Sequence, residues 1–390
     1  MIRQLATADF GERGVDAVVQ ALARPAAAAT REALGRVADI VDEVRRHGDV
    51  ALLELTKRFD GVALSADQLR VPEAEWAEAE AAVGGALRAA LIEAARRIES
   101  FHRHQLPRSW WVRDEHGSLL GQQVTPLDRV GCYVPGGTAA YPSTVLMTLL
   151  PARVAGVREL VVVSPPGNIY VALAKRLVFG EVGIDTIAGP SEVVVIADAG
   201  AAAAHVAADL LAQAEHDVLA RPVCLTDAPG LAAEVAAEIP RQLTRLPRAA
   251  IAAAAVRDHG AVVVTKDLAE AVEIANRLAP EHLELAVADP FAWLPAVRHA
   301  GAIFLGRHTP EVVGDYLAGP SHVLPTGATA RFASGLSVED FVKRSSLIHY
   351  SPAGLAAAWP HLAALAAAEG LLGHAEAARR RVEARVEGAE

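Results

Sequence analysis

The sequence predicts an α/β protein built from doubly wound parallel sheets, with helical extensions at both ends of the chain. Two observations predict this class. Short apolar segments that end in Gly or Pro alternate with helical stretches between residues 129 and 306, and residues 26–104 have a helical pattern throughout. Alternation of this kind is typical of parallel sheets with helices on both faces.

The helical part begins after an N-terminal extension, residues 1–25. Thr30 is a candidate N-cap for an amphipathic run that ends near Gly48. Residues 75–100 carry a long Ala/Glu/Arg pattern with helical period. We therefore expect helices to dominate the chain up to about residue 104.

The strand-like segments share a short apolar run followed by a turn. They are 129–137, 159–168, 183–198, 221–227, 260–267 and 300–306, with helical patterns at 200–216, 228–246 and 267–278 between them. Ligands of such sheets bind at the carboxyl ends of the strands. We expect strands to stop after about Arg331, and the Ala/Leu-rich stretch 353–385 to be helical, broken at Gly370 and Gly373. That tail could reach another subunit or cover its own core.

Composition narrows the function classes. The chain has 390 residues and a net charge of −10, which argues against a nucleic-acid partner. No run of about 18 uncharged apolar residues is present, so we expect no membrane span. The N-terminus has charges throughout and no apolar core, which predicts a cytoplasmic protein. Cys132 and Cys224 are expected to be buried packing thiols.

Several polar pairs could carry chemistry. Gln213 and His216 lie three residues apart, which places both on one helix face, where they could bind a metal or simply end the helix. Glu281 and His282 follow a proline, and adjacent Glu and His suit proton transfer, although a solvated turn explains them equally.

The remaining candidates are weaker when taken alone. Asp315 and His322 lie on a loop rich in Gly and Pro, where they could converge on an ion. Glu369 and His374 lie in the helical tail, where a single His is usually a surface residue. The turns VPGG (134–137) and PPGN (165–168) could present N–H groups to a phosphate, but such turns are common without a cofactor.

Together the segments resemble one family. YVPGG, AGPSEVVVIAD, LLAQAEHD, VTKDLAEAVEIANRLAPEHLEL, GDYLAGPSHVLPTGATARFASGLSVEDF and AAAEGLLGH, in that order, are similar to the histidinol dehydrogenases of histidine biosynthesis, from about residue 25 to 385. The APEHLE and HVLPT stretches carry the most specific part of the resemblance.

The resemblance implies two incomplete Rossmann-like domains. The first would comprise 26–130 with 193–274, the second 131–192 with 275–331, and 332–390 would form a tail that reaches the partner subunit of a homodimer. It implies oxidation of L-histidinol to L-histidine in two NAD-dependent steps, with zinc holding this small-molecule substrate.

Site roles are also implied by the resemblance. Zinc would be bound by Gln213, His216, Asp315 and, from the partner subunit, His374. Glu281 would activate water and His282 would take protons from the alcohol and the hydrate. The resemblance implies that the substrate is contacted by the zinc ligands, by His282, and by Ser191, His322 and Glu369. It implies that Tyr133 and Asn168 contact NAD.

The chain departs from the family pattern at one point. Family members place a further helix, strand, helix and strand between VVVSPP and PGN, whereas here Pro166 passes directly to Gly167. Roughly 45 residues, about one β-α-β unit or somewhat more, are missing. The missing block belongs to the lobe that binds NAD, so we expect a shortened second domain with NAD binding weakened or lost, and zinc binding retained.

Three functions follow from these expectations. The first is NAD-dependent oxidation of histidinol or a related amino alcohol. The second is a zinc enzyme without redox chemistry, which uses Glu281 and His282 for acid–base chemistry on an imidazole- or amine-bearing substrate. The third is a binding protein without activity, which the retained Glu281–His282 pair disfavours.

Overall fold

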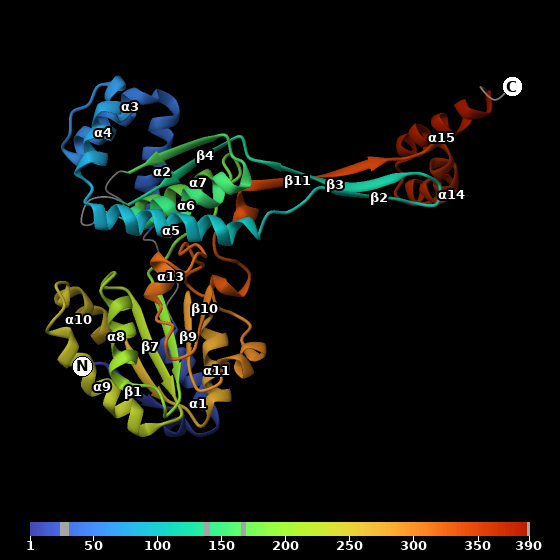
Figure 1. Ribbon diagram of the computed structural model, residues 1–390. Helices are drawn as coiled ribbons and strands as arrows, with labels where there is room; N and C mark the ends of the chain where they lie inside the picture. The colour runs from blue at the N-terminus through green and yellow to red at the C-terminus, as the bar shows by residue number, and fades with distance from the viewer. Residues whose placement is uncertain (24–30, 136–140, 165–168, 388–390) are drawn as a thin grey trace.

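The computed structural model describes residues 1–23, 31–135, 141–164 and 169–387. Figure 1 shows two lobes joined by short connections and a long arm that projects from the upper lobe. We call these the large lobe (β1, α1 and residues 192–316), the small lobe (α2–α7, β4 and β5) and the arm (β2, β3, β11, α14 and α15). Within the described residues, no helix combines the length and apolarity that crossing a bilayer requires.

The large lobe is built on a six-stranded parallel sheet. Its strands are β1 (Arg3–Ala6), β6 (Glu192–Ala197), β7 (Arg221–Thr226), β8 (Ala261–Val264), β9 (His282–Ala286) and β10 (Ala302–Leu305), in the spatial order β1-β8-β7-β6-β9-β10. Every residue of β6 and β9 is buried, as expected for central strands covered on both faces. The chain leaves β6 toward β7 and β8 and later returns to β9 on the other side, so the strand order reverses between β6 and β9.

Helices cover both faces of this sheet. Helices α8 (Ala203–Ala214), α9 (Pro229–Leu243) and α10 (Ala249–Asp258) pack on one face, and α1 (Gly14–Leu22) and α11 (Leu268–Leu278) pack on the other. The first face buries Leu210, Leu211 and Val235, and the second buries Val18 and Ile274. The remaining large-lobe elements are η1 (Thr7–Arg13), α12 (Pro290–Trp293), η3 (Leu294–Ala296) and α13 (Val312–Tyr316).

The small lobe has a two-stranded parallel sheet. Strands β4 (Arg129–Tyr133) and β5 (Glu159–Val163) pair in register from Arg129 opposite Glu159, and α6 (Pro142–Ala155) connects them. Its other elements are α2 (Arg31–His47), α3 (Asp49–Asp60), η2 (Ala66–Leu69), α4 (Glu73–Ala82), α5 (Gly85–Arg103) and α7 (Ile169–Val178). Among the described residues β5 pairs only with β4, so its outer edge is free, and Val162 and Val163 are exposed there.

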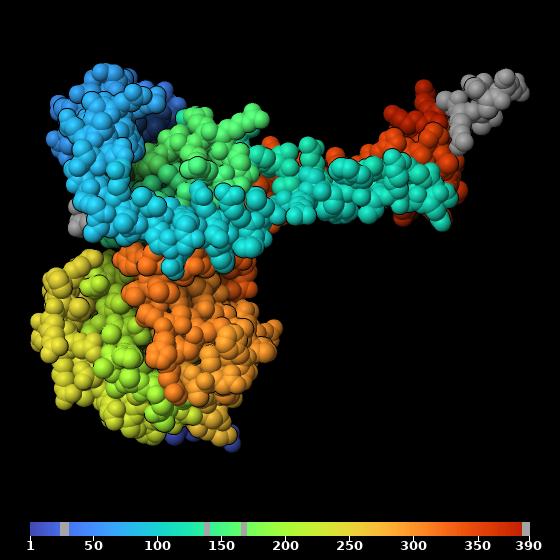
Figure 2. Space-filling view, in the orientation of Figure 1, coloured from blue at the N-terminus to red at the C-terminus, as the bar shows by residue number. Residues whose placement is uncertain are grey.

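The arm is an antiparallel ribbon that ends in two helices. Strands β2 (Trp110–Arg113), β3 (Leu119–Pro126) and β11 (Val342–His349) form the ribbon, and α14 (Pro352–Ala368) and α15 (Leu372–Glu387) lie at its tip. The short helices η4 (Thr329–Arg331) and η5 (Val338–Phe341) precede β11. Figure 2 shows that the arm stands clear of both lobes on the face in view. Trp111 is 60% exposed and Ile348 is 71% exposed, which is unusual for apolar side chains on strands.

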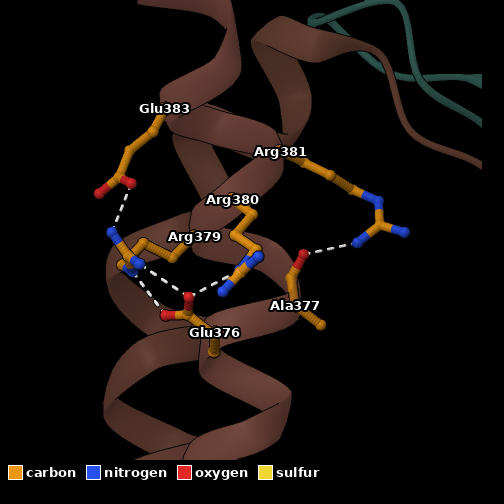
Figure 3. Close-up of polar contacts among 6 residues, drawn as sticks. All are labelled: Glu376, Ala377, Arg379, Arg380, Arg381 and Glu383. Atoms are coloured by element: carbon orange, nitrogen blue, oxygen red, sulfur yellow. Dashed lines mark hydrogen bonds and ion pairs between the residues drawn. The ribbon is translucent and has the colours of Figure 1, made fainter.

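The tip helix α15 carries its own surface ion pairs. Glu376 accepts hydrogen bonds from Arg379 and Arg380, one turn further along the helix, as Figure 3 shows. These contacts lower the pKa of the Glu376 carboxyl to about 2. Because the pairs are fully solvated, they favour the helical form only weakly.

The α/β class with parallel sheets is confirmed, but the strands are grouped differently from the expected domains. Strands β9 and β10 were expected in the second domain, together with 131–192, yet they belong to the large sheet beside β6. The N-terminal extension is also part of that sheet, because β1 pairs with β8. Residues after Arg331 were expected to be helical, and β11 corrects this. It pairs with β3 along its whole length, and most of its side chains are exposed, so no apolar core pattern marks it as a strand.

The expectation for the cysteines is confirmed. Cys132 and Cys224 are both free and buried. Burial raises the pKa of the Cys224 thiol to about 12, so this side chain is a neutral packing group.

A pair of carboxyl groups lies between β9 and α8. Glu284 is buried and shares a hydrogen bond with Asp209 of α8, and its Oε1 accepts the backbone N–H of Glu311 at 2.8 Å. Burial, followed by the neighbouring carboxylate, raises the pKa of Glu284 to about 9, and burial raises the pKa of Asp209 to about 6. One proton is therefore shared by the pair at neutral pH.

Replacing Glu284 by Gln is expected to raise the free energy of unfolding at pH 8 by up to about 5 kcal/mol. The folded-state pKa of Glu284 lies above its unfolded value, so wild-type stability falls as the pH rises from the unfolded pKa toward about 9. Glutamine keeps the hydrogen bonds without the ionisation. Denaturant unfolding at pH 5 and pH 8 checks this, and an equal difference at both pH values would contradict it.

Candidate active site

The sequence-predicted catalytic residues lie where the strands of the large sheet begin. Ser191 and Glu192 stand at the amino end of β6, and Glu281 and His282 stand at the amino end of the neighbouring strand β9. The expectation that the ligand site lies at the carboxyl ends of the strands was therefore wrong for these residues. The loop after β10 and the end of α8 supply the other side chains of this cluster.

Four predicted residues converge from separate segments. Gln213 lies in the last turn of α8 and is fully buried, whereas His216 follows that helix with a half-exposed ring. Asp315 of α13 lies between two histidines: its Oδ2 is 4.0 Å from Nε2 of His216, and its Oδ1 is 4.0 Å from Nδ1 of His322. Burial lowers the pKa of His322 to about 4, and the neighbouring His216 contributes in the same direction, whereas the hydrogen bond that the His322 ring donates to the backbone of Asp315 raises it.

His282 has a defined orientation. Its Nδ1 lies 3.0 Å from the backbone oxygen of Glu192, which can only accept a hydrogen bond, so the proton sits on Nδ1 and the lone pair on Nε2. Burial lowers the pKa of His282 to about 4, and the nearby His216 and His322 contribute in the same direction. The ring is therefore neutral at pH 7 and can accept a proton on Nε2.

Glu281 lies beside this ring. Its Oε2 accepts the backbone N–H of Glu192 at 2.9 Å and is 3.7 Å from Nδ1 of His282. Burial raises the pKa of the Glu281 carboxyl well above its usual value, and the Glu192 and Asp315 carboxylates add to this. A carboxylate with a raised pKa is a stronger base than one in water.

Glu311 was missed by the sequence reasoning. It is 1% exposed, and its Oε1 is 3.8 Å from Nε2 of His282. In the amide orientation that satisfies both ends, Gln213 donates to both Glu311 oxygens at 3.0 Å and accepts from the N–H of Glu192 at 3.2 Å. The four-residue spacing of Glu311 and Asp315 places both on one side of a helical turn, and this signal could have identified it.

The cluster has donors suited to a divalent cation. Ligand atoms of His216, Glu311 and Asp315 all lie within 4.8 Å of one another. The pKa of Glu311 is raised well above its usual value by burial and by the neighbouring carboxylates, and burial raises that of Asp315. A bound cation would remove this penalty, and imidazole with carboxylate donors matches zinc at a reactive site.

The other predicted residues are not in this cluster. Tyr133 ends β4 in the small lobe, where burial raises the pKa of its hydroxyl. Asn168, Gly136 and Gly137 lie outside the described residues. Glu369 and His374 lie at the tip of the arm, far from α13 (Figure 1). Within one chain the tip therefore supplies nothing to the cluster, and a contribution from a partner subunit stays a prediction.

Comparison with known proteins decides the family. The family model for histidinol dehydrogenase matches residues 23–166 and 166–382. The chain is 48% identical to a histidinol dehydrogenase of Geobacillus kaustophilus over 412 residues, covering 93% of this chain and 97% of that protein. A second relative, from Halalkalibacterium halodurans, is 47% identical over 397 residues, covering 89% of this chain and 93% of that protein.

The chain belongs to the histidinol dehydrogenase family. A crystal structure of histidinol dehydrogenase from Elizabethkingia anophelis superimposes with a TM-score of 0.92 at 29% identity, covering 98% of each chain. The family resemblance of the sequence is thereby confirmed. The family model breaks at residue 166, the same junction at which the sequence analysis expects the missing block.

Proposed function

We propose that the protein is a zinc-dependent histidinol dehydrogenase that oxidises L-histidinol, through an aldehyde held in the site, to L-histidine with NAD. The observation that carries the proposal is the convergence of Gln213, His216 and Asp315 beside the acid–base pair Glu281 and His282. Relatives that share nearly half of the sequence are named histidinol dehydrogenases.

In this proposal Gln213, His216 and Asp315 hold zinc together with the partner subunit's His374. Zinc, when bound, supplies Lewis acidity and an anchor for the amine and imidazole nitrogens of the substrate. The buried carboxyl of Glu311 holds the Gln213 amide in a fixed orientation. Supporting groups of this kind set the geometry of metal ligands. Ser191 and His322, on either side of the cluster, are the proposed substrate contacts.

His282 is the proposed base for the two oxidations. Its neutral ring can take the hydroxyl proton of the substrate on Nε2, because Nδ1 is committed to the backbone oxygen of Glu192. Loss of that proton makes the carbinol carbon a better hydride donor, and NAD, when bound, supplies the hydride acceptor. The same nitrogen serves the aldehyde hydrate in the second oxidation.

Glu281 is the proposed base for hydration of the aldehyde. Its carboxylate takes a proton from a water molecule as the water oxygen bonds to the aldehyde carbon. The N–H of Glu192 fixes one carboxylate oxygen, which leaves the other free to receive the proton. Burial of the site also limits escape of the reactive aldehyde.

The arm supports a dimeric assembly. Its exposed apolar side chains include Trp110, Trp111, Ile348, Leu365 and Leu372. Many large apolar side chains exposed on one projecting element are typical of a protein–protein interface. We infer that the arm packs on a second copy and delivers Glu369 and His374 to the cluster of that copy.

Mixing two inactive variants tests this arrangement. His216→Ala removes a ligand from the lobe and His374→Ala removes one from the arm, so each alone is expected to be inactive. A mixed dimer restores one complete site, and after full subunit exchange the mixture should regain about a quarter of wild-type activity. Activity that never rises above that of the separate variants, although mass spectrometry detects mixed dimers, would contradict a shared site.

The activity itself is tested by absorbance. Zinc-loaded protein with L-histidinol and NAD should produce the NADH absorption band, with two NADH formed per histidinol consumed. No NADH, together with no NAD binding by calorimetry, would refute the proposed reaction.

A second function is favoured by the small lobe. Its parallel sheet has two strands in the described residues, and the outer edge of β5 is exposed where a further strand–helix block would extend the NAD lobe. Loss of several contacts to NAD would weaken NAD binding, and each loss of about 1.4 kcal/mol of binding free energy lowers the affinity tenfold. The second candidate is therefore a zinc enzyme that uses Glu281 and His282 for acid–base chemistry on an imidazole- or amine-bearing substrate without NAD. A purified protein that contains zinc but does not bind NAD would favour this second candidate over the dehydrogenase.

A further inference from the structure

The large lobe has a second cleft, at the opposite ends of the strands from the candidate active site. It lies where the strand order reverses, between the carboxyl ends of β6 and β9, and has a volume of about 280 Å³. The start of α8 forms one wall, residues 306–310 form the other, and Glu284 and Ala286 of β9 form the floor. This reversal point is where doubly wound sheets bind their ligands, and none of the residues assigned to the proposed reaction lines it.

The cleft is acidic at one end and basic at the other. Asp209 and Glu284 line the inner end of the cleft. Asp209 lies in the middle of α8, and Glu284 lies two residues before the carboxyl end of β9. Arg307 and His308 follow β10 at the outer end, and His205 lies on α8 between the two ends. Two residues of strand span about 6.6 Å, so the two ends are separated by roughly the length of a small molecule.

The outer end of the cleft carries a guanidinium that is held in place by one carboxylate. The guanidinium of Arg307 lies over Gly200 and pairs with Asp198 through Nη2, which fixes its position at the mouth. Its Nε is buried and has no hydrogen-bond partner among the described residues. Buried polar atoms without a partner are rare in folded proteins and cost stability unless a ligand or water satisfies them. The imidazole of His308 lines the same end.

We propose that this cleft binds a small zwitterionic amino acid that carries a cationic side chain. The cationic group would lie against the Asp209–Glu284 pair, and the carboxylate would lie against Arg307 and His308. Both charged ends of such a molecule are then matched, and a neutral side chain of the same size leaves the acidic end unpaired. The cleft volume of about 280 Å³ admits one amino acid of this kind.

Calorimetric titration of the full-length, zinc-loaded protein with L-lysine and L-leucine tests the proposal. L-lysine should bind at least tenfold more tightly than L-leucine, which has similar size but no cationic side chain. Asp209→Asn should weaken L-lysine binding at least tenfold. Glu234→Gln, which neutralises an exposed carboxylate on the neighbouring helix α9, should leave it unchanged.

Further variants separate the cleft from the active site. His216→Ala disables the proposed zinc site and should leave L-lysine binding intact, so the result does not depend on the proposed dehydrogenase activity. If Asp209→Asn fails to fold, Ala208→Trp, at an exposed position that lines the cleft, should abolish binding by filling it. Three results would overturn the proposal: no binding of L-lysine to the wild type, equal binding of L-leucine, or loss of L-lysine binding in His216→Ala but not in Asp209→Asn.

Discussion

Replacing Glu281 by Gln is expected to slow the oxidation of the aldehyde by at least about a thousandfold, since general-base catalysis contributes factors of this order. Glutamine keeps the acceptor for the N–H of Glu192 but cannot take a proton from water. The first oxidation, which relies on His282, should be affected less. The variant should therefore form one NADH per histidinol in a rapid phase and the second only slowly, as followed by stopped-flow absorbance.

Glu284→Gln is the matched control for this experiment. It makes the same chemical change three residues further along β9, at a buried carboxyl outside the cluster. It should retain turnover while Glu281→Gln loses it. If Glu281→Gln oxidised the aldehyde at more than a tenth of the wild-type rate, the role of Glu281 as the base for hydration would be wrong.

Replacing His216 by Ala is expected to remove both the zinc and the activity. His216 is the imidazole of the group whose ligand atoms, with those of Glu311 and Asp315, all lie within 4.8 Å of one another. Its loss removes the only nitrogen ligand that the lobe itself supplies in the proposed set, and zinc is bound less tightly as nitrogen donors are lost from a mixed nitrogen and oxygen set. Metal analysis after dialysis should give less than about a tenth of a zinc ion per chain, because loss of one ligand costs several powers of ten in affinity.

His47→Ala provides the comparison for this variant. His47 is an exposed histidine in the last turn of α2, in the small lobe. Its removal should leave one zinc per chain and full turnover. A His216→Ala protein that still held one zinc per chain would refute the ligand set and with it the proposed dehydrogenase mechanism.

Much of the secondary structure could be predicted from local patterns. The Val-rich run of β6 and the helical period of α5 are properties of a few consecutive residues, and both elements were expected. The grouping of strands into sheets was not predictable in this way. Hydrogen bonds between β9 and β6 join residues about 90 positions apart, and the sequence spacing of two strands says nothing about which of them are neighbours.

The site shows the same limit. Gln213 with His216 and Glu281 with His282 could be found because each pair is adjacent on its own segment. The four-residue spacing of Glu311 and Asp315 was the one local signal for Glu311, and its partner was not predictable from it. The carboxyl of Glu311 meets the Gln213 amide because the chain after β10 folds back over β9. The location of these site residues at the amino ends of the strands was also not predicted. Ligand binding at the carboxyl ends of strands is a tendency of the fold class and does not fix the location of each site.

The two-stranded sheet of the small lobe has a consequence for protein engineering. A parallel strand is bonded only to its lateral neighbours, so a terminal strand and its crossover helix form a detachable module. Among the described residues no strand pairs with the outer edge of β5, which leaves a row of backbone donors and acceptors there without a strand partner. The connection between β5 and α7 is therefore a natural grafting point, at which a strand–helix segment from a longer relative could be spliced in without disturbing the rest of the scaffold.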